Sequence, residues 1–105
     1  MMKKRLIRAV TMLAIALFAS TGFAATSGKQ GFEKNCAVCH KDGGNMVNPS
    51  KTLSKKDREA NGVKSAKDII AKMRKPGPGM TAFDTKTISD KEAKMIAVYI
   101  MNTFK

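Results

Sequence analysis

The clearest pattern of apolar and polar positions lies near the C-terminus of the chain. Apolar or weakly polar side chains recur there with the i, i+3, i+4, i+7 spacing of one helix face, namely at Ile96, Tyr99, Ile100 and Thr103. Ser89 stands at an N-cap position, Glu92 follows it at the capping-box spacing, and Ile88 is the apolar residue before the cap. The pattern predicts a last helix that begins after Ser89, with Phe104 beside its apolar face.

Two shorter helices are predicted upstream by similar start and stop signals. In each, a serine precedes an aspartate at the capping-box spacing, and a Gly or Pro signal marks the end. The second has an apolar face formed by Ile69, Ile70 and Met73. The signals are Ser54, Asp57 and Asn61-Gly62 for the first helix, and Ser65, Asp68 and Pro76 for the second.

The first helix of the domain is predicted from about Ser27 to Val38, with Phe32 as its main apolar residue. Strand signals are weak, because the chain has no alternating run of β-branched residues. Loops rich in Gly and Pro separate the helices, notably "DGGNMVNPSKTL" and "PGPGMTAF". The sequence therefore predicts an all-α fold of about four helices, whose long loops wrap around a bound group.

The N-terminal segment does not belong to this helical domain. Basic residues precede an apolar run over 9–19, and the small residues Gly22 and Ala24 follow at positions suited to cleavage. This order predicts a secretory signal peptide over 1–24, a mature domain over 25–105 and a periplasmic location. The apolar run is shorter than the ~20 residues of a membrane-spanning helix, and an uncleaved N-terminal anchor is the alternative.

The charge of the chain is strongly positive, with 20 Lys and Arg against 8 Asp and Glu and a formal net charge of +12. Without the 4 basic residues of the signal peptide, 16 basic and 8 acidic residues remain, or +8. Such charge favours nucleic acid, anionic membranes or acidic proteins. An exported protein rarely meets nucleic acid, and the basic residues of this chain are scattered. We therefore expect protein partners with acidic docking surfaces and no binding to nucleic acid. We also expect no stable membrane insertion after the signal peptide is cleaved.

Both cysteines and the only histidine lie together in "NCAVCHKDGG", as Cys36, Cys39 and His40. A C-x-x-C-H run in an exported chain is typical of c-type haem attachment. Cysteines at this spacing project to one side of a helical turn, where each can bond one vinyl group of the same haem. The adjacent histidine can then reach the iron. The motif predicts one covalently attached haem c with His40 as an iron ligand.

Other functions of the motif are less well supported. A thioredoxin-like C-x-x-C pair requires a βαβ setting, and strand signals are weak. A zinc site usually has four ligands, whereas Cys36, Cys39 and His40 supply three. A disulfide between the two cysteines would close a very small loop and stabilise little. Among these possible functions of the motif, the sequence favours haem attachment.

A second axial ligand of the iron cannot be histidine, because the chain has only one. Methionine is the natural choice, since Met/His ligation is typical of electron-transfer haem proteins. The candidates after the signal peptide are Met46, Met73, Met80, Met95 and Met101. Met80 lies in the stiff Pro-Gly loop, where a side chain can be held across a haem face. We predict Met80 as the ligand, with Met46 and Met73 as alternatives.

Three segments, "GKQGFEKNCAVCHKDGGNMVNPSKTL", "GPGMTAF" and "IAVYI", make the chain resemble a class I c-type cytochrome of the small cytochrome c6 and cytochrome c553 group. The resemblance covers nearly the whole of 25–105. It implies that the first and last helices cross, with Gly28 and Phe32 meeting Ile96 and Tyr99. A glycine at such a crossing lets the two backbones approach closely.

The resemblance also implies the surroundings of the haem. It indicates that the carbonyl of Pro49 accepts the ring N–H of His40, and it places Thr81 where the family usually has proline after the axial methionine. The implied function is that of a periplasmic single-electron carrier between redox proteins, not an enzyme. The alternatives are a haem sensor or weak peroxidase with an open or displaceable sixth iron position, and a thiol protein without haem.

Overall fold

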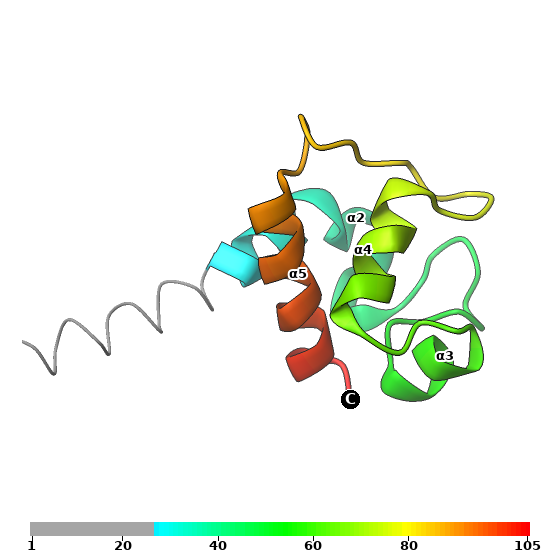
Figure 1. The fold of residues 1–105 in the computed structure, drawn as a ribbon. Coiled ribbons are helices and arrows are strands. Elements are labelled where there is room, and N and C mark those ends of the chain that lie inside the picture. Colours follow the sequence, from blue (N-terminus) through cyan, green and yellow to red (C-terminus); the bar gives the residue numbers. More distant parts are fainter. Residues whose placement is uncertain (1–26) are drawn as a thin grey trace, which may run out of the picture.

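The computed structural model describes residues 27–105, and within that range the secondary structure is helical, without a strand. The first helix covers residues 27–35, followed by α2 (Ala37–His40) and the short 3-10 helix η1 (Lys41–Gly43). Then come α3 (Lys55–Ala60), α4 (Ala66–Arg74) and α5 (Asp90–Thr103), joined by long loops (Figure 1). The predicted all-α fold is confirmed, whereas the predicted signal peptide over 1–24 lies outside the described residues.

The first helix is shorter than predicted, because the helical run is interrupted at Cys36 and resumes as α2. The side-chain amide of Asn35 donates to the Gly31 carbonyl at 3.1 Å, directly before the interruption. Side chains that enter the backbone ladder in this way accompany helix bends. The backbone bonds Cys36 N–H to Phe32 O at 2.8 Å and His40 N–H to Cys36 O at 2.9 Å still connect the two helical segments.

The predicted N-caps are confirmed at all three downstream helices. The hydroxyls of Ser54, Ser65 and Ser89 accept from the backbone N–H groups of the third residues along, at 3.3, 3.2 and 3.2 Å. Each bond satisfies an N–H group that has no partner within its own helix. Ile88, directly before the cap of α5, is completely buried, as expected of a staple residue.

The first helix and α5 cross at a very short distance. A Cβ atom on Gly28 would lie 2.6 Å from the Met95 carbonyl oxygen, so only glycine allows this approach. One turn further on, the rings of Phe32 and Tyr99 meet with centroids 5.4 Å apart. The helix crossing implied by the family resemblance is therefore present in the structure.

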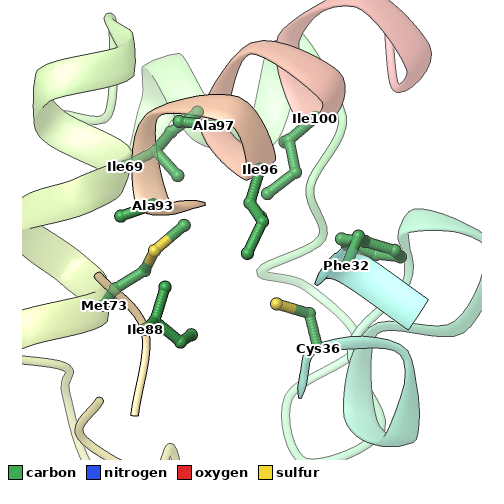
Figure 2. Packing of buried hydrophobic residues seen from close by; sticks show 9 residues of the cluster. All are labelled: Phe32, Cys36, Ile69, Met73, Ile88, Ala93, Ile96, Ala97 and Ile100. Carbon is green, nitrogen blue, oxygen red and sulfur yellow. The ribbon is translucent and has the colours of Figure 1, made fainter. Parts of the chain in front are cut away.

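The core lies between the first helix, α4 and α5. Figure 2 shows Met73 and Ile88 on one side of Ile96, and Cys36 and Phe32 on the other. The buried apolar residues are Phe32, Cys36, Ile69, Met73, Ile88, Ala93, Ile96, Ala97 and Ile100. Within residues 27–105, no helix is long and apolar enough to cross a membrane.

Candidate cofactor site

A cavity of about 340 Å³ opens between the C-x-x-C-H segment, α3, α4 and the loop over 77–81. Its volume lies in the range of ~300–1,000 Å³ that is usual for small-molecule sites. Part of its wall is apolar, formed by Leu53, Val63, Ile69, Phe83 and Ile100. Cys36, Cys39, His40 and Met80 all line it, although Met80 is 40 positions from His40 in the sequence. This set of two thiols, one imidazole and one thioether on an apolar wall fits a covalently attached haem.

The Cys36 thiol does not have the character of a catalytic redox thiol. Burial raises the pKa of the Cys36 thiol to about 11, so the group stays protonated at neutral pH. Catalytic C-x-x-C pairs depend instead on a lowered thiol pKa. Nor do the described residues contain a group of three or more His, Cys, Asp or Glu side chains that could hold a metal ion by itself. The raised pKa of Cys36 argues against a thiol redox function of the motif.

The ring of His40 is oriented by a backbone carbonyl. Its Nδ1 atom lies 2.7 Å from the Gly44 carbonyl oxygen. Because a carbonyl can only accept, Nδ1 carries the proton and Nε2 keeps its lone pair for a ligand in the cavity. The ring is thus prepared to bind a metal through Nε2.

The partner of this hydrogen bond corrects a prediction, because the carbonyl is that of Gly44 and not that of Pro49. Asp42 and Gly43 both adopt positive φ, at 56° and 79°, and turn the chain back directly after the motif. The turn is closed by Gly44 N–H donating to Lys41 O at 3.0 Å. Pro49 is exposed and does not line the cavity.

The loop that contains Pro49 is organised by Asn45, which the sequence analysis did not identify. Its side-chain oxygen accepts from Val47 N–H at 3.0 Å and from Asn48 N–H at 2.9 Å, while its side-chain nitrogen donates to Lys51 O at 2.9 Å. Met46 N–H donates to Cys39 O at 2.9 Å and ties this loop to the motif. An Asn after two glycines is a signal for such a side-chain-supported turn.

The three candidate methionines have different environments. Met80 lines the cavity and is 36% exposed, whereas the Met46 side chain is 76% exposed and does not line it. Met73 lines the cavity from α4, but it is 3% exposed and packed in the core. Met80 is therefore the candidate on the wall of the cavity that lies outside the core.

The loop that carries Met80 is fastened to α4 on the C-terminal side of Met80. Phe83 N–H donates to Met73 O at 2.8 Å. The guanidinium of Arg74 donates to Phe83 O at 3.1 Å and to Ile88 O at 2.8 Å, and it forms an ion pair with Asp90 at 2.9 Å. The sequence analysis did not identify Arg74, because a basic residue in the last turn of a helix resembles an ordinary surface residue.

Comparison with known proteins shows similarity over most of the chain. Residues 23–100 match the family model described as "Cytochrome C oxidase, cbb3-type, subunit III". Cytochrome c6 of Rippkaea orientalis is 42% identical over 77 residues, which cover 73% of this chain and 68% of the relative. Cytochrome c6 of Thermostichus vulcanus is 38% identical over 106 residues, covering 96% of this chain and 93% of the relative.

Solved structures show the same similarity. The outer membrane cytochrome F, OmcF, of Geobacter sulfurreducens has a TM-score of 0.72 and 44% identity, with 74% of this chain and 99% of that chain covered. Cytochrome c6C from Synechococcus sp. PCC 7002 has a TM-score of 0.69 and 31% identity, with 74% and 94% covered. Sequence and fold thus point to the same group of proteins.

Proposed function

Because the chain belongs to the c-type cytochrome family, whose cytochrome c6 members are electron-transfer proteins and not enzymes, we propose that this monohaem electron carrier works between redox proteins of the periplasm with His/Met axial ligation. The observation that supports the ligation is that Cys36, Cys39, His40 and Met80 line one cavity. These positions come from two segments far apart in the sequence.

Each of these residues has a distinct role in the proposal. The thiols of Cys36 and Cys39 form thioether bonds to the two vinyl groups of the haem. His40 binds the iron through Nε2, because its Nδ1–H is engaged by the Gly44 carbonyl. The thioether of Met80 supplies the second axial ligand from the loop that Arg74 fastens to α4.

The bound haem c supplies an iron that alternates between the ferrous and ferric states. The chain keeps the two axial ligands in place in both states. Its apolar wall, which includes Ile69 and Phe83, limits the access of water to the iron. An outer-shell bond such as that from His40 to Gly44 strengthens the histidine as a ligand and fixes its ring.

Exposed residues around the cavity suit a brief contact with an acidic protein. Lys51 and Lys72 are exposed and line the cavity. The apolar side chains of Val38 and Val47, which are 78% and 60% exposed, also line the cavity. Redox encounters use interfaces of less than ~1,200 Å², and opposite charges accelerate them. The proposed partners therefore carry acidic docking surfaces.

The periplasmic location rests on the N-terminal segment. We propose that residues 1–24 are a signal peptide that is removed on export, leaving a cytochrome domain over 25–105. The start of the family match at residue 23 supports a domain boundary at this point. The measurement is the N-terminal sequence of the protein isolated from the periplasm, and an N-terminus at Met1 in a membrane fraction would contradict the proposal.

The ligation is tested by comparing the purified holoprotein with Met80→Ala and Met46→Ala. Met80→Ala is expected to convert a low-spin optical spectrum to a high-spin one and to lower the reduction potential, because the iron loses its thioether ligand. Met46→Ala is the matched control, since the Met46 side chain is exposed and does not line the cavity. A spectrum that Met80→Ala leaves unchanged would exclude Met80 as the ligand.

Carbon monoxide binding separates the electron carrier from the alternative of a haem sensor or weak peroxidase. An electron carrier with both axial positions filled is expected to bind carbon monoxide slowly and weakly at native pH. Fast, tight binding by the unmodified protein would indicate an open or displaceable sixth position. A colourless product from a host that matures c-type cytochromes would instead support a protein without haem.

A further inference from the structure

Arg58 is the buried charged residue among residues 27–105, with a relative exposure of 6%. Its Nε atom donates to the Leu53 carbonyl at 2.8 Å, and its Nη2 atom donates to the Phe104 carbonyl at 3.1 Å. A guanidinium has five N–H groups. Nη1 and the second N–H of Nη2 therefore have no hydrogen-bond partner among the described residues.

No carboxylate of residues 27–105 neutralises this guanidinium. The ion pair present in that range joins Arg74 to Asp90. The carboxylate of Asp57, the residue before Arg58, accepts hydrogen bonds from the hydroxyl and the backbone N–H of Thr52. A buried cation without a counter-charge is unfavourable. Arg58 is thus a buried charge that lacks an anion.

The free donors of Arg58 belong to a side chain that lines the cofactor cavity. Every fully buried side-chain nitrogen and oxygen of the described residues has a hydrogen-bond partner. Because Nη1 of Arg58 has no partner among these residues, this atom keeps some accessible surface. The charged side chains on the cavity wall are Lys51, Asp57, Arg58 and Lys72. Three cations and one anion leave this wall positive, which suits a ligand that carries carboxylates.

We propose that Arg58 holds a propionate carboxylate of the haem c through the free N–H groups of its guanidinium. The inference rests on the proposed haem attachment. Haem carries two propionates, and the planar guanidinium fork is well suited to a carboxylate. Because Arg58 is buried, a carboxylate of a docked protein cannot reach it, whereas a group inside the cavity can. The competing source of an anion is a small ion from solution.

The contact places a fixed positive charge close to the iron. Removing that charge while the propionate stays ionised makes the surroundings more negative, which favours the ferric state and lowers the reduction potential. We expect Arg58→Gln to raise the ferric-to-ferrous ratio at a given applied potential about 3- to 10-fold. The upper value corresponds to ~59 mV for a one-electron couple. Arg58→Lys keeps the charge without the fork, and its shift is expected to be smaller.

The contact itself is tested by nuclear magnetic resonance of the unmodified ferrous holoprotein. Nuclear Overhauser effects are expected between the side-chain protons of Arg58 and the methylene protons of one haem propionate. Their absence, with the Arg58 signals assigned, would overturn the inference. Protein that carries no covalent haem would instead refute the proposed function on which the inference rests, so the two failures are distinguishable.

The potential is tested by redox titration of Arg58→Gln and Arg58→Lys at pH 8, with Lys55→Gln as the matched control. Lys55 lies on the same helix, is exposed and does not line the cavity, so its loss removes an equal charge away from the haem. If the reduction potential of Arg58→Gln shifts no more than that of Lys55→Gln, the inference is overturned. A potential of the unmodified protein that depends on phosphate concentration would assign the anion to solution and overturn it as well.

Discussion

A single hydrogen bond decides how His40 presents its ring to the cavity. The Gly44 carbonyl, 2.7 Å from Nδ1, requires the proton on that nitrogen and leaves Nε2 free. Gly44 is placed there by the left-handed residues Asp42 and Gly43. For Gly43 the absence of a side chain also matters, because a Cβ atom would lie 2.5 Å from the Phe104 ring. Backbone conformation at these residues thus determines the geometry of a proposed metal ligand.

The helix crossing gives a prediction for Gly28→Ala. The added methyl group would meet the Met95 carbonyl oxygen at 2.6 Å and the Tyr99 Cβ atom at 3.0 Å, so the helices must separate. We expect the free energy of unfolding to fall by about 1–3 kcal/mol, as measured by denaturant unfolding of the holoprotein.

Val98→Ala is the control for this substitution. Val98 also lies on α5, its side chain is 44% exposed, and it does not line the cavity. The control is expected to change the free energy of unfolding by less than about 0.5 kcal/mol, as is usual for exposed positions. Equal destabilisation by the two substitutions would show that the close crossing is not the cause.

At the scale of elements, the loop over 75–89 has little regular structure, and its C-terminal half is held to α4. Arg74 joins α4 to the part of the chain that follows Met80, through Phe83, Ile88 and Asp90. Its guanidinium is a charged donor, and such bonds contribute about 1.5–3 kcal/mol each when one partner is ionised. The position of Met80 thus depends on a residue several positions away from it.

This contact predicts that Arg74→Gln releases the Met80 loop. Losing about 1.4 kcal/mol of loop attachment raises the open population roughly tenfold. Carbon monoxide binding to the ferrous holoprotein should accelerate by a similar factor, because it requires the sixth position to open. Lys75→Gln, at an exposed neighbour with no side-chain hydrogen bond in the described region, serves as the control. Equal rates in both variants would exclude the attachment role.

The turn that precedes α5 predicts a dependence of stability on pH. Backbone and side-chain hydrogen bonds from Thr87, followed by a backbone bond from Lys86, lower the pKa of the Asp84 carboxyl below its ordinary 3.8. A carboxyl whose folded pKa is depressed stabilises the fold above its unfolded value, and this contribution is lost as the pH falls through the folded pKa.

Thermal unfolding between pH 6 and pH 2 is expected to show this loss below about pH 4. Asp84→Asn should make the acid decline shallower, because the titrating group is gone. Asp42→Asn changes an exposed aspartate with no side-chain hydrogen bond in the described region, and Asn tolerates its positive φ. The Asp84 assignment would be wrong if Asp42→Asn flattened the curve as much.

At the scale of the whole molecule, the core and the cofactor cavity share residues. Cys36, Ile69, Met73 and Ile100 belong to the buried cluster and also line the cavity. A domain of this size buries only about 60–65% of its surface and is marginally stable by itself. Haem bound in the cavity therefore completes the core of the protein.

This overlap predicts that Cys36→Ser/Cys39→Ser gives a poorly folded chain. Without thioether bonds the haem is not retained, and the shared wall of the cavity loses its packing partner. Circular dichroism and thermal unfolding, compared with the holoprotein from the same host, measure the effect. Helix content and a cooperative transition equal to those of the holoprotein would show that the chain folds independently of its cofactor.

How far the sequence predicts this molecule depends on how local each interaction is. The caps Ser54, Ser65 and Ser89 were predicted correctly, because an N-cap bond involves residues only three positions apart. The bend at Cys36 was missed, because the helical spacing alone does not reveal that Asn35 bonds into the ladder. Pro49 was wrongly assigned as the partner of His40, because a family resemblance does not specify how the intervening turn folds.

The sequence by itself determined the helices, their caps, the all-α class and the haem motif, because these features depend on neighbouring residues. Only the tertiary structure decided which carbonyl orients His40, which methionines line the cavity, and that Arg58 is buried beside it. These features arise where α3, α4 and the loops meet across long stretches of sequence. Contacts between distant segments depend on how the whole chain packs, and a local pattern does not encode that packing.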